Sequence, residues 1–125
     1  HPARAAGPAR RVERVVSAIA ALDPAPDAVV VSGDLTQLGE PAQYARVREL
    51  LAPLRMPVHV LPGNHDVRGA LRDALLAGVD TGPRDYLQYE ARVKGLRLLV
   101  CDTIIPGEDG GRLCSRRIGW FSLRN

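Results

Sequence analysis

Two short polar segments carry the side chains of this 125-residue chain that could do chemistry. Each directly follows an apolar run, and they are Ser-Gly-Asp-Leu-Thr at 32–36 and Pro-Gly-Asn-His-Asp at 62–66. The carboxylate of Asp34 has two oxygens and can bridge two metal ions. The side-chain oxygen of Asn64 is a neutral ligand for a divalent cation, and His65 can bind a metal or donate a proton to a phosphoryl oxygen. These groups could therefore hold a metal ion and act on a phosphate group.

Three neighbouring residues support the predicted site. Gly63 lets the backbone turn sharply at the end of its apolar run, and Gly33 directly precedes the predicted ligand. Asp66 could orient the His65 ring by accepting a hydrogen bond from the second ring nitrogen. A plainer interpretation of each segment stays open: an aspartate that caps a turn for the first, and a polar β-turn for the second.

The surrounding elements predict an α/β fold that brings the two segments together. The runs at 28–32 and 58–61 are apolar without alternation, which is typical of strands buried on both faces of a parallel sheet. Between them, 41–51 has apolar residues at helical spacing and a proline in the first turn. This βαβ unit would place both polar segments at the carboxyl edge of the sheet, where α/β proteins usually bind ligands.

The rest of the chain predicts short elements around this unit. They are an amphipathic helix over 10–22, a helix over 70–77, a β-hairpin with strands at 86–93 and 96–101, and a helix that opens near 118. Residues 1–9, rich in alanine, proline and glycine, are predicted as a flexible N-terminal segment. Residues 10–125 are then one partial domain.

Composition and charge narrow the function classes. Hydrophobic residues make up 46% and charged residues 25%, which is ordinary for a folded domain, and no apolar run approaches the ~20 residues of a membrane span. The net charge of +3 comes from scattered arginines without interleaved aromatic residues, which disfavours nucleic-acid binding. The two cysteines match no metal-binding spacing and form no disulfide framework, which favours a cytoplasmic protein.

The paired segments resemble the signature of the calcineurin-like metallophosphoesterases. Val-Ser-Gly-Asp-Leu-Thr followed by Leu-Pro-Gly-Asn-His-Asp is most similar to the bacterial cyclic-nucleotide and glycerophosphodiester phosphodiesterases. The resemblance implies a four-layer α-β-β-α sandwich, two divalent ions (Fe, Mn or Zn) and a small phosphodiester substrate. It implies that Asp34 bridges the two metals, that Asn64 binds one of them near the substrate phosphate, and that His65 stabilises the transition state. By resemblance, a metal-bound hydroxide attacks phosphorus.

The chain also departs from the pattern of that family. The Asp-x-His that opens the family's site and the Gly-His-x-His near its C-terminus do not occur in these 125 residues. We therefore expect a truncated or incomplete form that is weak or inactive alone, because catalytic metal sites keep about three protein ligands per ion. Two alternatives stay open: a non-catalytic remnant that binds a partner or ligand, and a nucleic-acid-binding or nuclease-like protein. Uncovered strands would favour self-association through exposed sheet edges.

Overall fold

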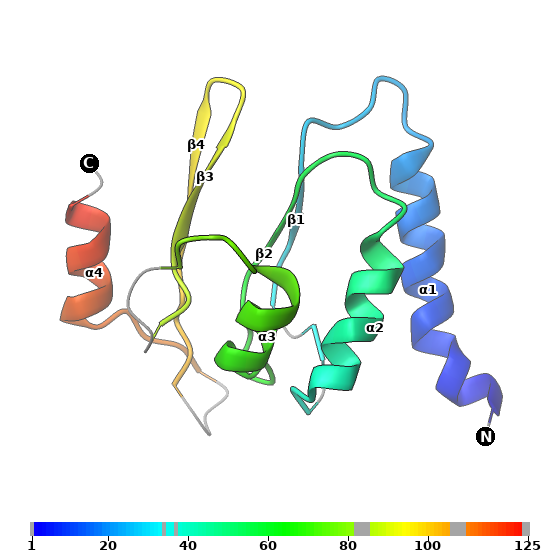
Figure 1. Cartoon of the computed structure of the whole chain (residues 1–125), viewed down its shortest axis with the longest axis horizontal. Coiled ribbons are helices and arrows are strands. Elements are labelled where there is room, and N and C mark those ends of the chain that lie inside the picture. Colours follow the sequence, from blue (N-terminus) through cyan, green and yellow to red (C-terminus); the bar gives the residue numbers. More distant parts are fainter. Residues whose placement is uncertain (1, 34, 37, 82–85, 106–109, 124–125) are drawn as a thin grey trace.

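A computed structural model describes residues 2–33, 35–36, 38–81, 86–105 and 110–123, and it describes no side chains at 2–8 and 121. Helices and strands follow one another in the order shown in Figure 1. They are α1 (Pro2–Ala20), β1 (Val29–Val31), α2 (Pro41–Leu51), β2 (Val58–Val60), α3 (Arg68–Leu75), β3 (Tyr89–Val93), β4 (Leu96–Val100) and α4 (Ser115–Ser122).

The predicted βαβ unit is confirmed. Strands β1 and β2 pair in parallel, with Val29 opposite Val58, and the ladder continues where the Leu61 N–H donates to the Val31 carbonyl at 3.0 Å. Helix α2, which connects the strands, has the predicted bounds. It begins with a proline and a reciprocal capping box between Glu40 and Gln43, which gives the N–H groups of these two residues partners.

The predicted hairpin is also confirmed, although its first strand is shorter than expected. Strands β3 and β4 are antiparallel, and β3 begins at Tyr89 instead of residue 86. The preceding backbone amides have other partners, because the Leu87 N–H donates to the Asp102 carboxylate at 2.7 Å and the Gln88 N–H donates to the Thr81 carbonyl at 3.2 Å. The mixed α/β class expected from the sequence is therefore what the chain adopts.

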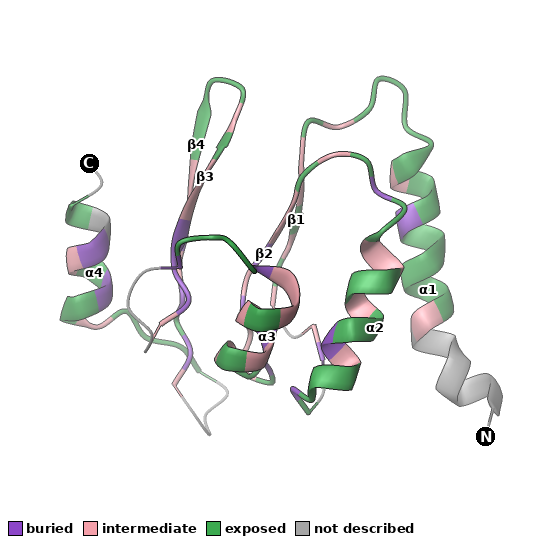
Figure 2. Cartoon of the chain, viewed as in Figure 1, coloured by how far each residue is buried: buried purple, intermediate pink, exposed green. Residues whose placement is uncertain are grey.

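The core lies where the two sheets face each other. Figure 1 shows α4, the β3–β4 hairpin, the β1–β2 pair and then α2 with α1 as successive layers, with α3 near the junction of the sheets. The Tyr89 hydroxyl donates to the Val60 carbonyl at 2.6 Å and so joins the two sheets directly. Figure 2 shows buried segments at the base of the hairpin and on helices α1, α2 and α4. The buried core residues are Tyr44, Val60, Leu71, Leu76, Leu87, Tyr89 and Val100.

The first helix differs from the prediction at its start. Helix α1 begins at Pro2 and therefore covers positions 2–9, where a flexible segment was predicted. Four of the first nine residues are alanine, the strongest helix former, although Gly7 and Pro8 in the same stretch oppose a helix. In the part of the chain that the structure describes, no helix combines the length and the apolar character needed to cross a membrane.

The burial predicted for both faces of β1 is wrong. The Val30 side chain is 55% exposed, and Val15 of helix α1, 57% exposed, lies on the same groove. This groove between α1 and β1 has a volume of about 400 Å³ and an apolar lining. Among the described residues, α1 and β1 line it together with Leu51 and Leu54. One face of β1 therefore stays open.

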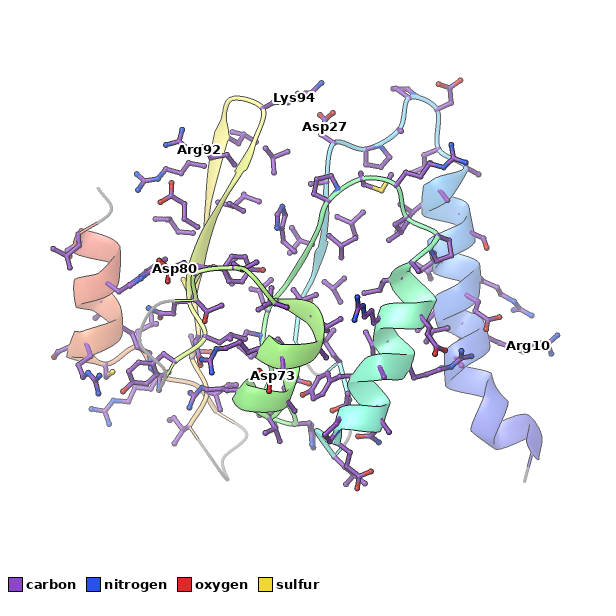
Figure 3. All side chains as sticks on the ribbon, in the orientation of Figure 1. Arg10, Asp27, Asp73, Asp80, Arg92 and Lys94 are labelled. Atoms are coloured by element: carbon purple, nitrogen blue, oxygen red, sulfur yellow. The ribbon has the colours of Figure 1, made fainter. Side chains whose placement is uncertain are left out.

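At the end of the sheets away from the polar segments, an ion pair on the surface links the hairpin to the segment before β1. At the hairpin turn, the Lys94 ammonium lies 3.1 Å from the carboxylate of Asp27, which precedes β1, and Figure 3 shows the two side chains near each other. Both are more than half exposed, so the pair contributes at most about 1 kcal/mol. The contacts that position the candidate site are at the other end of the strands.

Candidate active site

The two polar segments lie against each other, backbone to backbone, at the carboxyl ends of β1 and β2. We call residues 32–36 and 62–66 the first and second motif turns. Gly33 has a φ of +32°, and a Cβ added there would lie 3.0 Å from the Cα of Gly63. The positive φ at position 33 favours glycine over other residues. The close approach of the two turns also requires that this residue have no side chain.

Gly33→Ala should destabilise the fold by about 1–2 kcal/mol or more, because alanine is strained at this φ and its methyl group would meet the Gly63 backbone. Urea unfolding with one spectroscopic signal measures the change. The matched control is Gly69→Ala in helix α3, where a Cβ meets nothing within 4 Å. The control should be neutral or stabilising by up to about 1 kcal/mol. Equal effects of both variants would contradict a special packing role for Gly33.

Asp66 fastens the two motif turns together. Its side chain is buried, and four donors of the described residues reach it. They are the Leu35 N–H at 3.2 Å, the Thr36 N–H at 3.3 Å, the Gly63 N–H at 2.8 Å and the Tyr44 hydroxyl at 2.8 Å. Because these donors surround both carboxylate oxygens, the described contacts of Asp66 anchor the turns. That Asp66 also orients the His65 ring, as expected from the sequence, stays a prediction.

Tyr44 connects helix α2 to this carboxylate. Its side chain is completely buried, and its hydroxyl both donates to Asp66 and accepts the Val67 N–H at 2.9 Å. Burial, more than the nearby Asp66 carboxylate, raises the pKa of Tyr44 to about 12, so the hydroxyl remains a donor at neutral pH. The sequence predicts only a helix with apolar spacing over 41–51, and a tyrosine at one of those positions is the one available signal for a buried polar contact.

The predicted ligand and acid residues stand at the second motif turn. Asn64 is half-buried and His65 is exposed, and both lie between Gly63 and Asp66, whose backbone and side chain hold the turn. Asp34, the predicted bridging ligand, lies outside the described residues. The described residues that flank it, Gly33 and Leu35, contact the second turn.

The donor set at this edge fits a divalent metal only in part. An amide oxygen and an imidazole are both accepted by borderline divalent ions. Within the described ranges, however, no group of three or more histidine, cysteine, aspartate or glutamate side chains could hold a metal ion. The described side chains can therefore contribute to a metal site but do not complete one.

A second buried carboxylate, which the sequence analysis did not assign to the site, supports it from the hairpin side. Asp102 is fully buried at the end of β4 and accepts two hydrogen bonds from Arg68, at 2.6 Å to Nε and 3.0 Å to a terminal nitrogen. Arg117 of helix α4 donates to the Asp102 carbonyl at 2.8 Å and to the Ile104 carbonyl at 2.9 Å. Because Arg68 opens helix α3 directly after the second motif turn, this network joins that turn to the hairpin and to α4.

The same region contains a thiol with a lowered pKa. Cys114 directly precedes α4 and donates to the Tyr86 hydroxyl at 3.4 Å. A hydrogen bond from that hydroxyl to the thiolate, helped by backbone N–H groups and by the Arg117 cation, lowers the pKa of Cys114 to about 7. Burial instead raises the pKa of Cys101. Both cysteines are free thiols.

Iodoacetamide should therefore alkylate Cys114 faster than Cys101 between pH 6 and 8, with a midpoint near pH 7. Peptide mass spectrometry of timed reactions gives the two rates. A lowered pKa in the folded state also means that this thiolate contributes its full stabilisation above the pKa of an unfolded cysteine and loses it as the pH falls through about 7. Tyr86→Phe removes the main cause and should shift the midpoint upward; an unchanged midpoint would contradict this assignment.

Comparison with known proteins identifies the family of this chain. A profile of the calcineurin-like phosphoesterases matches residues 1–120. This chain is a member of the calcineurin-like phosphoesterase family. It is 37% identical over 102 residues to a cAMP/cGMP dual specificity phosphodiesterase of Mycobacterium tuberculosis, which covers 78% of this chain and 31% of that protein.

Two further relatives have similar identity to this chain. The chain is 34% identical over 113 residues to a glycerophosphodiester phosphodiesterase of Enterobacter lignolyticus, and the match covers 88% of this chain and 40% of the relative. It is 34% identical over 105 residues to a 3',5'-cyclic adenosine monophosphate phosphodiesterase of Pseudomonas aeruginosa, covering 84% and 36%. This calcineurin-like chain thus spans about a third to two fifths of the length of these curated relatives. Calcineurin-like phosphoesterases use divalent metal ions.

Proposed function

We propose that the protein containing this chain hydrolyses small phosphodiesters, of the cyclic-nucleotide or glycerophosphodiester type, in a metal-dependent reaction. The observation that carries the proposal is the joining of the two motif turns through Asp66, which holds Asn64 and His65 beside the residues that flank position 34. The family assignment and the names of the relatives support the same reaction class.

Each residue of the proposed site has a distinct role. Two divalent ions of Fe, Mn or Zn, when bound, would supply positive charge at the phosphoryl oxygens and lower the pKa of water. Asn64 would hold an ion through its side-chain oxygen, and Asp34 is the proposed bridging ligand. His65 is exposed on the turn, where a substrate phosphate could reach it. It would donate a hydrogen bond, and then the proton, to the leaving oxygen.

The test is metal-dependent turnover by the full-length product of the gene and, in parallel, by this 125-residue segment. Bis(p-nitrophenyl) phosphate with Mn²⁺ reports the reaction class, and cyclic AMP and a glycerophosphodiester distinguish the two substrate types. We expect turnover by the full-length protein that is lost on chelation and restored by Mn²⁺. No turnover by the full-length protein with Mn²⁺, Zn²⁺ or Fe²⁺ would overturn the proposal.

A non-catalytic binding role is the second candidate for the 125-residue segment itself. It is favoured by the finding that the described residues contain no complete group of metal ligands. The open face of β1, where Val30 is 55% exposed, supports self-association of the isolated segment, which sedimentation at several concentrations would measure. We further propose a cytoplasmic location, because two cysteines form no disulfide framework. We also propose a small-molecule partner and not a nucleic acid, because no aromatic residues interleave with the scattered arginines.

A further inference from the structure

We propose that Tyr44 is a positioning residue for the candidate active site, acting through Asp66 to hold the two motif turns at a set separation. The inference deepens the proposed function and rests on it for one of its two tests. Tyr44 lies outside the two turns, and its hydroxyl donates to the Asp66 carboxylate at 2.8 Å. It therefore ties helix α2, the crossover helix, to the junction of the turns.

The hydrogen-bond directions around the Tyr44 hydroxyl leave little freedom. The Val67 N–H donates to this oxygen at 2.9 Å, so the hydroxyl hydrogen is free to point to Asp66, 2.8 Å away. The ring is fully buried and belongs to the core cluster around Leu71, so the oxygen cannot move without disturbing that cluster. The Tyr44 hydroxyl therefore donates to Asp66 from a fixed position on helix α2.

This donor also restricts where the carboxylate can place its other bonds. One oxygen of Asp66 accepts from Tyr44 and from the Thr36 N–H, and the other accepts from the N–H groups of Leu35 and Gly63. With the hydroxyl removed, the carboxylate can rotate, and the bonds to the first turn are the longest and weakest, at 3.2 and 3.3 Å. The separation of the turns would then vary, and with it the positions of the residues they carry.

Amide hydrogen exchange of the metal-free full-length protein tests the positioning directly. Tyr44→Phe removes the hydrogen bond to the Asp66 carboxylate together with the one from the Val67 N–H, and it should accelerate exchange at Leu35, Thr36 and Gly63 by about tenfold relative to the amides of β4. The matched control is Tyr89→Phe. Tyr89 is also buried, with a pKa raised to about 12 by burial, but its hydroxyl donates to the Val60 carbonyl and not to Asp66. Equal exchange at the motif turns in both variants would overturn the proposal.

The second test asks whether the positioning matters for the site. Titration with Mn²⁺ should show about tenfold weaker binding by Tyr44→Phe, with kcat lowered and KM little changed, while Tyr89→Phe keeps the wild-type values. Faster exchange with unchanged Mn²⁺ affinity and kcat would overturn the positioning role, because Tyr44 would then be structural only. If the wild-type protein neither binds Mn²⁺ nor turns over substrate, the proposed function fails. The exchange result then decides the inference about Tyr44 alone.

Discussion

His65→Ala is expected to lower kcat of the full-length protein by about 10²- to 10⁴-fold, the usual contribution of a positioned general acid. KM should change little, because the proton is transferred only in the transition state. The side chain is exposed on the second motif turn, so its removal costs little folding energy and the loss would be one of chemistry. Steady-state rates with bis(p-nitrophenyl) phosphate and Mn²⁺ measure both constants.

The matched control is His59→Gln, which removes the other histidine of the βαβ unit. His59 lies within β2, opposite Val30, before the second motif turn begins. This variant should keep the wild-type kcat when it is folded, as judged by circular dichroism. A His65→Ala protein with wild-type turnover would show that the reaction does not use this imidazole, and the assignment of the second motif turn as the catalytic turn would then fail.

Asp102→Ala is expected to reduce the free energy of unfolding by about 3–5 kcal/mol, because it leaves buried positive charge without its partner. Arg68 is only 19% exposed and Arg117 only 7% exposed, so water cannot replace the carboxylate freely. The substitution also removes the acceptor of the Leu87 and Ile104 N–H groups. Since domains of this size are stable by about 5–15 kcal/mol, the variant should unfold at a much lower urea concentration.

Glu90→Ala provides the control for Asp102→Ala. Glu90 accepts two hydrogen bonds from Arg97, at 2.7 and 3.2 Å, so its geometry resembles that of the Asp102–Arg68 pair. Arg97 is 36% exposed, however, and the pair lies on the outer part of the hairpin. Its removal should cost much less than the loss of Asp102, because water can replace the exposed partner. Similar losses in the two variants would mean that burial does not make the Asp102 network costlier to break than an exposed pair.

Local pattern was enough to predict the elements that position the site. The apolar runs before Gly33 and Gly63, and the helical spacing between them, predicted a parallel βαβ unit whose strands end at one edge, and β1, α2 and β2 form it. Such predictions succeed because strand and helix periodicity, and turn residues, act over a few neighbouring positions. The resemblance of the two motifs to the calcineurin-like family rests on the same local stretches, and the family assignment confirms it.

What the sequence by itself determined, then, is the order of elements and the chemical types at their ends: Asn64 and His65 after one strand and the Gly33 turn after the other. The tertiary structure alone decided how those ends are held. Asp66 bonds to amides about thirty positions earlier in the chain, and Asp102 bonds to Arg68 across a similar separation. Local sequence pattern also did not predict the open face of β1 at Val30. A buried carboxylate needs hydrogen-bond donors. Which donors lie near it depends on the packing of the whole fold and not on its neighbours in sequence.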